Sequence, residues 1–428
     1  MRRGVETDAR RLGGNFWHLF GASATSNVSD GVMQAAAPLL AATLTRDPFL
    51  VSLLASLAFL PWLLFAIPAG TLVDRVDRRR AMAGANLLRA LAIVALAVSV
   101  VTGWVSLPVL YAVALVLGTA EVVYDSAARA LLPRVVPKRQ LERGNSLLTT
   151  AESTGQIFLG PPVGAWLFAI AASLPLFGGA TAYLVAGALV LLVAGRFRPE
   201  RETTTTAGQD TREGLAWLRR HPILFPLMLT TGVAATLGTM TSGILVLFVL
   251  EELGLSERAF GLFLAVAGVG AIAGSLLSPL ATRLMGRTTS MGVLQLVSAV
   301  AVTVMGLWVH PVVAVAGLAV SAGSVTAFNV QIMSVRQAII PERLFGRVQG
   351  AYRTVIWGGI PVGTLLGGLL GRLLGLPAVF VLTGVGSGLA GLGVWWVLHR
   401  HRVAIEAAFD EDESAGRADA APGIPNDL

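Results

Sequence analysis

The chain has no cysteine and few charged residues. Only 13% of its 428 residues are charged, whereas an average soluble domain carries roughly 25%. Without cysteine, a disulfide, a thiolate metal site and a cysteine nucleophile are all excluded. The five histidines do not show the HExxH spacing of a zinc protease helix. The shortage of charge also excludes an ordinary soluble surface on a chain of this length.

Apolar residues and glycine are abundant instead. Hydrophobic residues make up 54% of the chain, glycine occurs 48 times and the mean hydropathy is +0.72. A membrane-spanning helix needs about 20 mostly apolar residues, and glycine allows such helices to pack closely. Twelve segments in series meet this length, which disfavours a soluble protein with buried apolar helices. The predicted spans are residues 16–44, 49–73, 81–102, 106–128, 146–172, 176–196, 223–250, 260–282, 289–309, 311–335, 347–371 and 376–398.

A polar, basic linker divides these spans into two halves. Within the linker, Thr211–His221 is expected to form a short surface helix. The last residues are polar and acidic, a composition typical of disorder. The predicted units are an N-terminal six-helix bundle (residues 1–196), a cytoplasmic linker (197–222), a C-terminal six-helix bundle (223–398) and a disordered cytoplasmic tail (399–428).

The two halves share short sequence patterns. Gly160-Pro161-Pro162-Val163-Gly164 in the fifth span corresponds to Gly359-Ile360-Pro361-Val362-Gly363 in the eleventh. Parallel six-helix repeats are typical of transporters, with the solute path between the halves. The sequence therefore predicts an all-α integral membrane protein with twelve transmembrane helices in two pseudo-symmetric bundles.

The basic residues indicate the orientation. Of the 32 lysines and arginines, nearly all fall in segments on one side of the predicted membrane; the exceptions are Arg46, Arg258 and Arg372 on the other side and Arg89 within the third span. The positive-inside rule makes the basic side cytoplasmic, with both termini there. The net charge of +7 then reflects topology and contact with anionic lipid, not nucleic acid. Arginine greatly outnumbers lysine, as in GC-rich bacteria, so we expect the plasma (inner) membrane of a bacterium.

The loop after the second span carries a specific motif. Residues 70–80 read GTLVDRVDRRR, which resembles the G-x-L-x-D-R-x-x-R-R loop of the major facilitator superfamily. The family's glycine in the variable pair is absent, because Val76 and Asp77 stand there. The resemblance implies a latch on the cytoplasmic side, in which Arg78 pairs with Asp125; a plain basic anchor is the alternative. The implied latch residues are Gly70, Asp74, Arg75, Arg78, Arg79 and Asp125.

The fifth span carries a second motif. Gly160, Pro161 and Gly164 are similar to the GPxxGG core of exporters that exchange solute for protons, although Ala165 replaces the last glycine. Ordinary helix packing is the alternative. Residues 26–31 and 120–125 further resemble the superfamily branch with macrolide efflux proteins and siderophore exporters. This resemblance implies export of a small amphiphilic molecule.

Three acids lie within predicted spans of the first half: Asp30, Glu121 and Glu152. Ionisable groups in a membrane are costly and mark ion pathways. We predict that Asp30 and Glu121 are the main proton sites and that Glu152 is secondary. A structural hydrogen bond or an arginine pair, with Arg89 or Arg353 as partner, is the alternative for each.

Neutral polar and aromatic residues provide weaker candidates for solute contact. They are Asn27, Gln34, Thr236, Phe328, Asn329 and Trp357; ordinary helix packing is the alternative for most of them. The combined prediction is a secondary active transporter, driving proton-coupled efflux of drug-, macrolide- or siderophore-like molecules by alternating access.

A proton-coupled importer of a nutrient or metabolite with the same fold remains open. No P-loop and no metal-ligand spacing is found in the sequence, so neither an enzyme nor a cofactor is expected; the proton gradient is the expected energy source. The expected partners are a small solute, protons and the lipid bilayer, with no nucleic acid, and a monomer is expected.

Overall fold

The computed structural model describes residues 12–73, 75–195, 197 and 216–409. Over these ranges the secondary structure is helical and contains no strand. The N-terminal half comprises α2 (Gly14–Leu44), α3 (Pro48–Val73), α4 (Arg78–Val101), α5 (Leu107–Val135), η1 (Lys138–Gln140), α6 (Leu141–Glu152), η2 (Ser153–Leu159), α7 (Gly160–Ile170) and α8 (Leu174–Leu191). The C-terminal half comprises α10 (Leu224–Gly238), η3 (Thr239–Thr241), α11 (Leu245–Leu247), η4 (Phe248–Glu252), α12 (Glu257–Met285), α13 (Arg287–Leu307), α14 (Pro311–Ile339), α15 (Glu342–Leu374) and α16 (Leu376–Arg400).

The predicted spans correspond to these helices. Within the described ranges, ten helices are long and apolar enough to cross a membrane. The two remaining predicted spans correspond to α2 and to the continuous run α6–η2–α7, which contain more polar residues. Their crossing of the membrane stays a prediction. Large apolar side chains are exposed on these helices, such as Leu276 at 75% and Leu389 at 66%. Exposed apolar surface of this kind suits contact with lipid.

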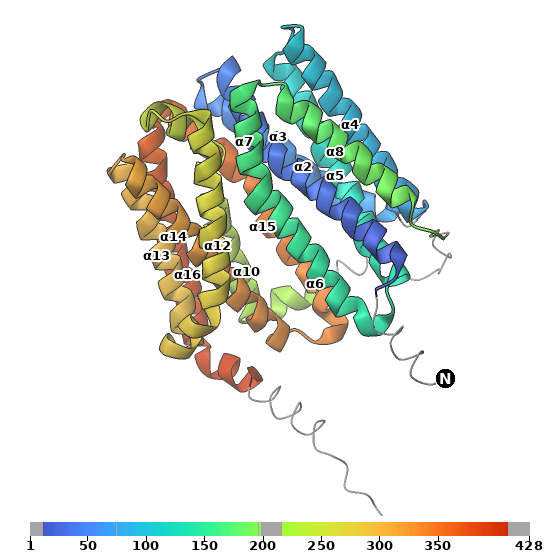
Figure 1. The fold of residues 1–428 in the computed structure, drawn as a ribbon. Helices are drawn as coiled ribbons and strands as arrows, with labels where there is room; N and C mark the ends of the chain where they lie inside the picture. The colour runs from blue at the N-terminus through green and yellow to red at the C-terminus, as the bar shows by residue number, and fades with distance from the viewer. Residues whose placement is uncertain (1–11, 74, 196, 198–215, 410–428) are drawn as a thin grey trace, which may run out of the picture.

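The two halves meet along two pairs of helices. In Figure 1 the N-terminal half lies on the right and the C-terminal half on the left, with α3 packed against α15 and α7 against α12. Two ion pairs join the halves at the upper end, Arg46–Glu251 and Arg372–Asp47, each with 3.4 Å between nitrogen and oxygen. Just below, the Ser56 hydroxyl donates a hydrogen bond of 3.2 Å to the Pro361 carbonyl.

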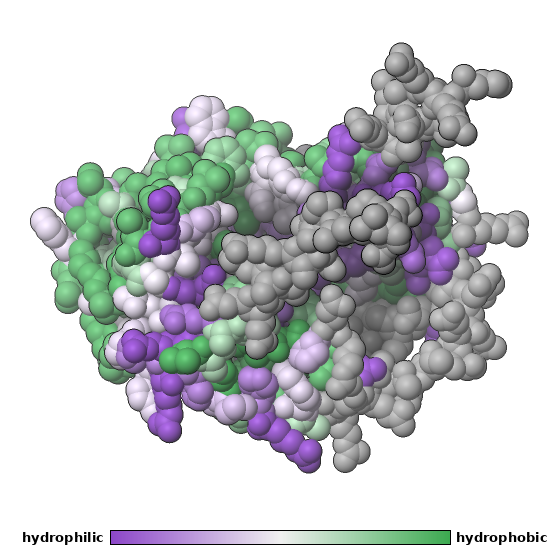
Figure 2. Space-filling view, turned by 90° about the horizontal axis from the view of Figure 1, so that it is seen from below, coloured by the Kyte–Doolittle hydropathy of each residue, from purple (hydrophilic) through white to green (hydrophobic). Residues whose placement is uncertain are grey.

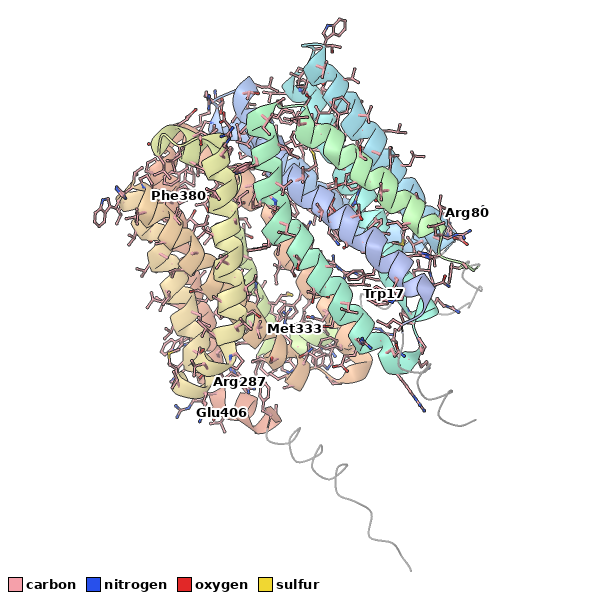
Figure 3. The ribbon with its side chains drawn as sticks, in the orientation of Figure 1. Trp17, Arg80, Arg287, Met333, Phe380 and Glu406 are labelled. Atoms are coloured by element: carbon pink, nitrogen blue, oxygen red, sulfur yellow. The ribbon has the colours of Figure 1, made fainter. Side chains whose placement is uncertain are left out.

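The halves separate toward the opposite end. In Figure 1, α12 and the α6–α7 run are adjacent near the top and diverge toward the bottom. Both ends of the described chain lie on this lower side, as do Arg287 and Glu406 in Figure 3, whereas Phe380 lies near the top. Figure 2 views the lower side directly and shows hydrophilic residues gathered on it, with apolar residues along the left rim. We call this lower side, on which Arg287 lies, the basic face.

The linker contacts the C-terminal half. Residues 216–220 are helical, so the expected short helix is present over its described part, and Leu218 is fully buried beside Leu224 of α10. The imidazole Nδ1 of His221 accepts hydrogen bonds from the backbone N–H groups of Ile223 (3.3 Å) and Leu224 (3.2 Å). His221 thereby caps the start of α10. Burial, assisted by the nearby His401, lowers the pKa of His221.

The prediction of disorder beyond residue 399 is wrong for its first part. Residues 402–409 form a helix in which Ile405 is fully buried among apolar residues of the C-terminal half. The guanidinium of Arg287 lies 3.1 Å from the ring centroid of Phe409. Ile405 and Phe409 lie one helical turn apart and dock this segment on the C-terminal half. The polar composition of the segment as a whole does not indicate this contact. The remainder of the tail lies outside the described residues.

Candidate functional site

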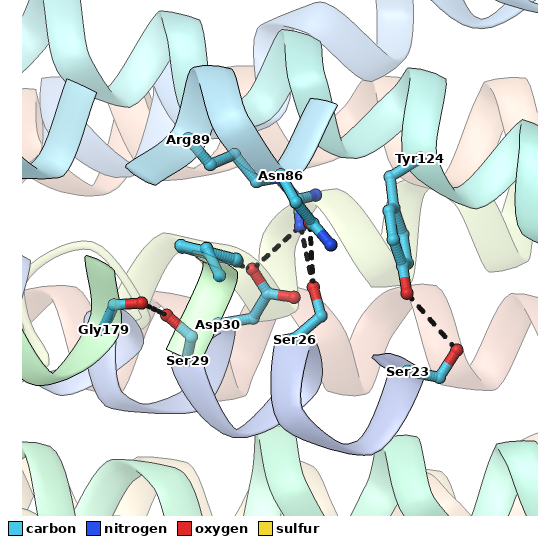
Figure 4. A network of polar contacts seen from close by, with 9 residues as sticks. Ser23, Ser26, Ser29, Asp30, Asn86, Arg89, Tyr124 and Gly179 are labelled. Carbon is cyan, nitrogen blue, oxygen red and sulfur yellow. Dashed lines mark hydrogen bonds and ion pairs between the residues drawn. The ribbon is translucent and has the colours of Figure 1, made fainter. Parts of the chain in front are cut away.

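One face of α2 carries a row of polar residues into the interior of the N-terminal half. Ser23, Ser26 and Ser29 are buried and face α5, α4 and α8 respectively (Figure 4). The Ser29 hydroxyl donates to the Gly179 carbonyl at 3.0 Å. Spacings of three and four residues place such side chains on one helix face, so this row brings α2 against three helices through hydrogen bonds.

Asp30 and Arg89 form the centre of this network. Nη1 of Arg89, on α4, lies 3.5 Å from Oδ1 of Asp30 and donates a 3.2 Å hydrogen bond to Ser26 (Figure 4). The Tyr183 hydroxyl, on α8, donates a short hydrogen bond to the same Asp30 oxygen. The rings of Tyr124 and Tyr183 lie 5.3 and 5.2 Å from the guanidinium carbon, within cation–π range.

The pair is almost completely removed from solvent. The side chain of Arg89 is 1% exposed and that of Asp30 is 14% exposed. A buried charge is tolerated only when it is paired and hydrogen-bonded, and each member supplies the other's countercharge. Of the two partners expected for Asp30, Arg89 is the one that the structure brings to it. The proton-coupling role of Asp30 stays a prediction.

Glu121 and Glu152 have different surroundings. Neither carboxylate forms a hydrogen bond or an ion pair with any residue that the structure describes. Glu121 lies on α5 and is partly buried, whereas Glu152 at the end of α6 is exposed. The groups that act electrostatically on Glu121 are Asp30, Arg89, Asp125 and Glu152. Glu121 is therefore an unpaired carboxyl group within a predicted span, close to a paired one.

The motif glycines of α7 lie directly against the site. A side-chain carbon at Gly160 would lie 2.5 Å from the Cα atom of Gly31, the residue after Asp30, and one at Gly164 would collide with the Val32 carbonyl. Glycine is thus required here by close approach of two backbones. The preceding stretch, η2, is π-helical and leads into Pro161; π-bulges are frequent at functional sites. The structure places the glycine–proline motif of α7 against the two residues that follow Asp30, a proximity that sequence alone does not predict.

The predicted latch pair is not formed. Arg78 donates to the Ala130 carbonyl at 3.1 Å, while Asp125 pairs with Arg129 on its own helix at 3.4 Å. Arg78 therefore still ties the loop to α5, but through the backbone near the end of that helix. Arg79 donates to the Val193 carbonyl at 2.9 Å. Arg75 is exposed and Gly70 lies in the last turns of α3, whereas Asp74 lies outside the described residues.

Asp77, which replaces the family's glycine, has a role that the motif does not predict. It is the N-cap of α4, where its Oδ1 accepts from the Arg80 N–H at 3.1 Å. Its Oδ2 accepts from the Phe197 N–H at the start of the linker, at 3.2 Å. Burial acts to raise the pKa of Asp77, but these N–H donors and the Arg79 charge outweigh it and the pKa is lowered. An aspartate directly before a helix is a recognisable capping signal.

An aromatic cluster marks the junction of the two halves. The rings of Trp62 on α3 and Trp357 on α15 have centroids 4.9 Å apart. The guanidinium carbon of Arg353 lies 4.7 and 4.6 Å from these two centroids. Val122, the residue after Glu121 on α5, is buried in the same cluster. Trp357 is thus the predicted solute residue that lies clearly between the halves.

The other predicted solute residues are scattered. Asn27 is partly buried next to η2, and Gln34 and Asn329 are exposed. Thr236 bonds its own helix at the Gly232 carbonyl (2.9 Å) and packs against Gly359, so it is a packing contact within the C-terminal half. Phe328 is 3% exposed within an apolar cluster of that half. In this conformation Phe328 cannot contact a solute, because its apolar ring is more stable in the core.

Comparison with known proteins identifies the family. The family model described as transmembrane secretion effector matches residues 13–418. The chain belongs to this family of major facilitator transporters. A major-facilitator-type transporter of Mycobacterium tuberculosis is 29% identical over 90% of this chain and 91% of its own length. The multidrug efflux pump Tap of Mycolicibacterium fortuitum is 27% identical over 84% of this chain and 90% of its own length.

The fold of this major facilitator transporter also matches solved structures. A bacterial homologue of the iron transporter ferroportin, solved in an inward-facing state, has a TM-score of 0.72 at 17% identity, covering 90% of this chain and 99% of that one. The predicted superfamily and all-α membrane fold are confirmed. The protein is a multi-pass membrane transporter and not an enzyme.

Proposed function

We propose that this transporter exports small amphiphilic molecules in exchange for protons. The observation that carries the proposal is Glu121, a carboxyl group without an ion pair among the described residues, inside a predicted span and within electrostatic reach of the Asp30–Arg89 pair. An unpaired carboxyl in a membrane marks a proton relay by default. The likeness to a multidrug efflux pump and the glycine–proline motif beside Asp30 support export over import.

Glu121 is the proposed proton carrier. The residue is partly buried and its carboxyl group is free of an ion pair within the described ranges, whereas Asp30 is held by Arg89 and Tyr183. Adding or removing a charge at Glu121 changes the field at the Asp30–Arg89 pair, because both pair members act on Glu121 electrostatically. Glu152, exposed and also unpaired, is proposed as a secondary acceptor nearer to the basic face.

The proposed orientation places the basic face in the cytoplasm of a bacterial cell, by the positive-inside rule. The halves are joined by ion pairs at the other end and diverge toward the basic face (Figure 1). In this orientation the two halves are joined on the outer side of the membrane and diverge on the cytoplasmic side. Outward opening would then require the upper contacts to break while the lower ends approach, a rocking of two halves as in other transporters built from repeats.

The proposal is tested in inverted membrane vesicles energised to be acid inside. A pH-sensitive dye reports the interior while antibiotics, dyes and siderophores are added one at a time. At least one compound should dissipate the gradient in wild-type vesicles, and Glu121→Gln vesicles should not respond to it. Glu406→Gln, which changes a carboxyl group outside the predicted spans, is the matched control and should respond normally.

Two results would contradict this function. Retention of full, pH-dependent transport by Glu121→Gln would remove Glu121 from the proton path. If deletion of the gene starved the host of a nutrient and did not increase its sensitivity to toxic compounds, the importer would be favoured.

A further inference from the structure

Arg353 is a half-buried cation without a hydrogen-bond acceptor among the described residues. Its Nη2 atom is buried and unpartnered, and no hydrogen bond or ion pair joins Arg353 to any described residue. Arg89 and Arg336 also have unpartnered nitrogen atoms, but each has at least one acceptor: Arg89 has Asp30 and Ser26, and Arg336 donates to Gln349 at 2.9 Å. Buried donors in folded proteins are almost always satisfied, so an exception requires an explanation.

The surroundings of Arg353 stabilise its charge but do not satisfy its donors. The two indole rings of Trp62 and Trp357, one from each half, lie against the guanidinium. Ring faces attract a cation but accept no strong hydrogen bond. A guanidinium offers its donors in its own plane, in a geometry that suits a carboxylate or another oxyanion with two oxygens. The missing acceptor is therefore an oxyanion beside two aromatic rings.

Unpaired carboxyl groups of the N-terminal half lie within electrostatic reach of Arg353. Glu121, Glu152 and Asp125 all act electrostatically on Arg353, together with the like charge of Arg129. None of the three acids comes within ion-pair distance of Arg353, and Asp125 is already paired with Arg129. Arg353 on the C-terminal half is thus an unpaired cation, and Glu121 and Glu152 on the N-terminal half are two unpaired carboxyl groups that act on it.

We infer that the solute is an amphoteric aromatic molecule, which carries an oxyanion for Arg353 and a cationic nitrogen for Glu121, with its flat body against Trp62 and Trp357. This inference rests on the proposed function for the existence of a small amphiphilic solute. It assigns the substrate class, because the negative group of the ligand pairs with Arg353 and its positive group pairs with Glu121. Because Arg353 and Glu121 belong to opposite halves, such a ligand bridges them.

The test compares two dyes that differ in one charge. Rhodamine 19 has a free carboxylate and a cationic xanthene, and rhodamine 6G is its ethyl ester, a cation only. Binding of each to the purified full-length transporter in lipid nanodiscs is measured by equilibrium dialysis at pH 7.5, with empty nanodiscs subtracted. The wild type should prefer rhodamine 19 by about tenfold or more, because a charge-assisted hydrogen bond is worth at least that factor.

Variants assign the preference to Arg353. In Arg353→Gln the two dyes should bind within about twofold of one another, and Arg353→Lys should keep only part of the preference, because lysine lacks the planar fork. Arg258→Gln removes another arginine that lies against a tryptophan, Trp166, at 5.6 Å, and should leave the preference intact. Size-exclusion profiles verify that each variant is folded.

Equal affinity of the wild type for both dyes, preference for the ester, or binding of neither dye would overturn the inference, and the wild-type comparison needs no variant. A preference that persists in Arg353→Gln would also overturn it. Since binding is measured without a proton gradient, these results are independent of proton coupling. If the vesicles fail to exchange protons while the dye preference holds, the proposed export mechanism is wrong and the binding site for an amphoteric molecule stands.

Discussion

Asp30 on α2 and Arg89 on α4 neutralise each other in the interior of the N-terminal half, with 3.5 Å between Oδ1 and Nη1. Tyr183 donates to the same carboxylate from a third helix. The pair thus connects three helices of one bundle at a position close to the membrane interior.

Removing one partner of this pair should be far more harmful than removing both. Arg89→Met leaves the Asp30 carboxylate buried without its countercharge, which costs roughly 3–5 kcal/mol. The double variant Asp30→Asn, Arg89→Met should recover a large part of that loss, because no uncompensated charge remains. Thermal unfolding midpoints of the wild type, both single variants and the double variant measure the coupling. Strictly additive effects would mean that the ion pair does not exist in the membrane.

The contact between Gly31 and Gly160 should not tolerate a methyl group. Gly160→Ala places a carbon 2.5 Å from the Gly31 Cα atom, and overpacking of this kind costs about 1–3 kcal/mol. Gly84→Ala, also in a helix but with no atom within 4 Å of the new carbon, should be neutral or slightly stabilising. Unfolding midpoints and vesicle transport check both. Equal behaviour of the two variants would show that α2 and α7 are farther apart.

The cap at Asp77 should give a pH-dependent contribution to stability. The pKa of Asp77 is lowered by its N–H donors and the Arg79 charge, which outweigh burial. Its contribution to the free energy of unfolding is therefore fully present above the unfolded-state pKa of about 3.9. That contribution is lost as the pH falls through the lower folded-state pKa. Asp77→Ala should cost about 0.5–2 kcal/mol at pH 7 and progressively less below pH 4.

Unfolding midpoints of wild type and Asp77→Ala across this range measure the difference. Ser106, the N-cap residue of α5, makes no side-chain capping bond, so Ser106→Ala should show no such pH-dependent difference. A constant gap between wild type and Asp77→Ala at all pH values would contradict the capping role.

His221 should destabilise the start of α10 in acid. Its Nδ1 accepts two backbone hydrogen bonds, and protonation removes that acceptor. Burial and His401 lower its folded pKa, so the unfolded chain binds the proton first. The contribution of His221 to the stability of α10 is fully present above the unfolded-state pKa of about 6.5. It declines as the pH falls from that value toward the lower folded-state pKa. Hydrogen exchange of the α10 amides at pH 7.5 and 5.5 measures this opening.

The substitution His221→Asn retains a capping oxygen and cannot titrate in this range. It should therefore reduce the difference in exchange between the two pH values. An unchanged difference would assign the pH dependence to another group.

The membrane pattern could be predicted because it depends on local sequence alone. Apolar length, glycine content and arginine placement identify spans and halves without knowledge of packing, and the loop at 70–80 identifies the superfamily. The latch pair could not be predicted, since Arg78 and Asp125 lie far apart in sequence and their distance depends on the conformation. Arg78 finds the Ala130 carbonyl instead.

The candidate site depended on contacts that sequence does not contain. Arg353 and Trp62 belong to different halves, and only the packing of α3 against α15 brings them together. The burial of Phe328 in this conformation could not be predicted for a related reason: an aromatic residue in a membrane helix has the same sequence pattern whether it faces a path or a core. Asp30, by contrast, was predicted because a carboxyl within an apolar span is conspicuous.

The backbone contact at Gly31 and Gly160 has a mechanical consequence. With no side chains between them, the backbones of α2 and the η2–α7 segment are in direct contact, and no change of side-chain rotamer can absorb a displacement of one toward the other. Helix α2 carries the Asp30 charge, and α7 packs on α12 of the opposite half, where Gly261 faces Ala165. Two backbone-level contacts therefore connect the charged helix α2 to the joint between the halves.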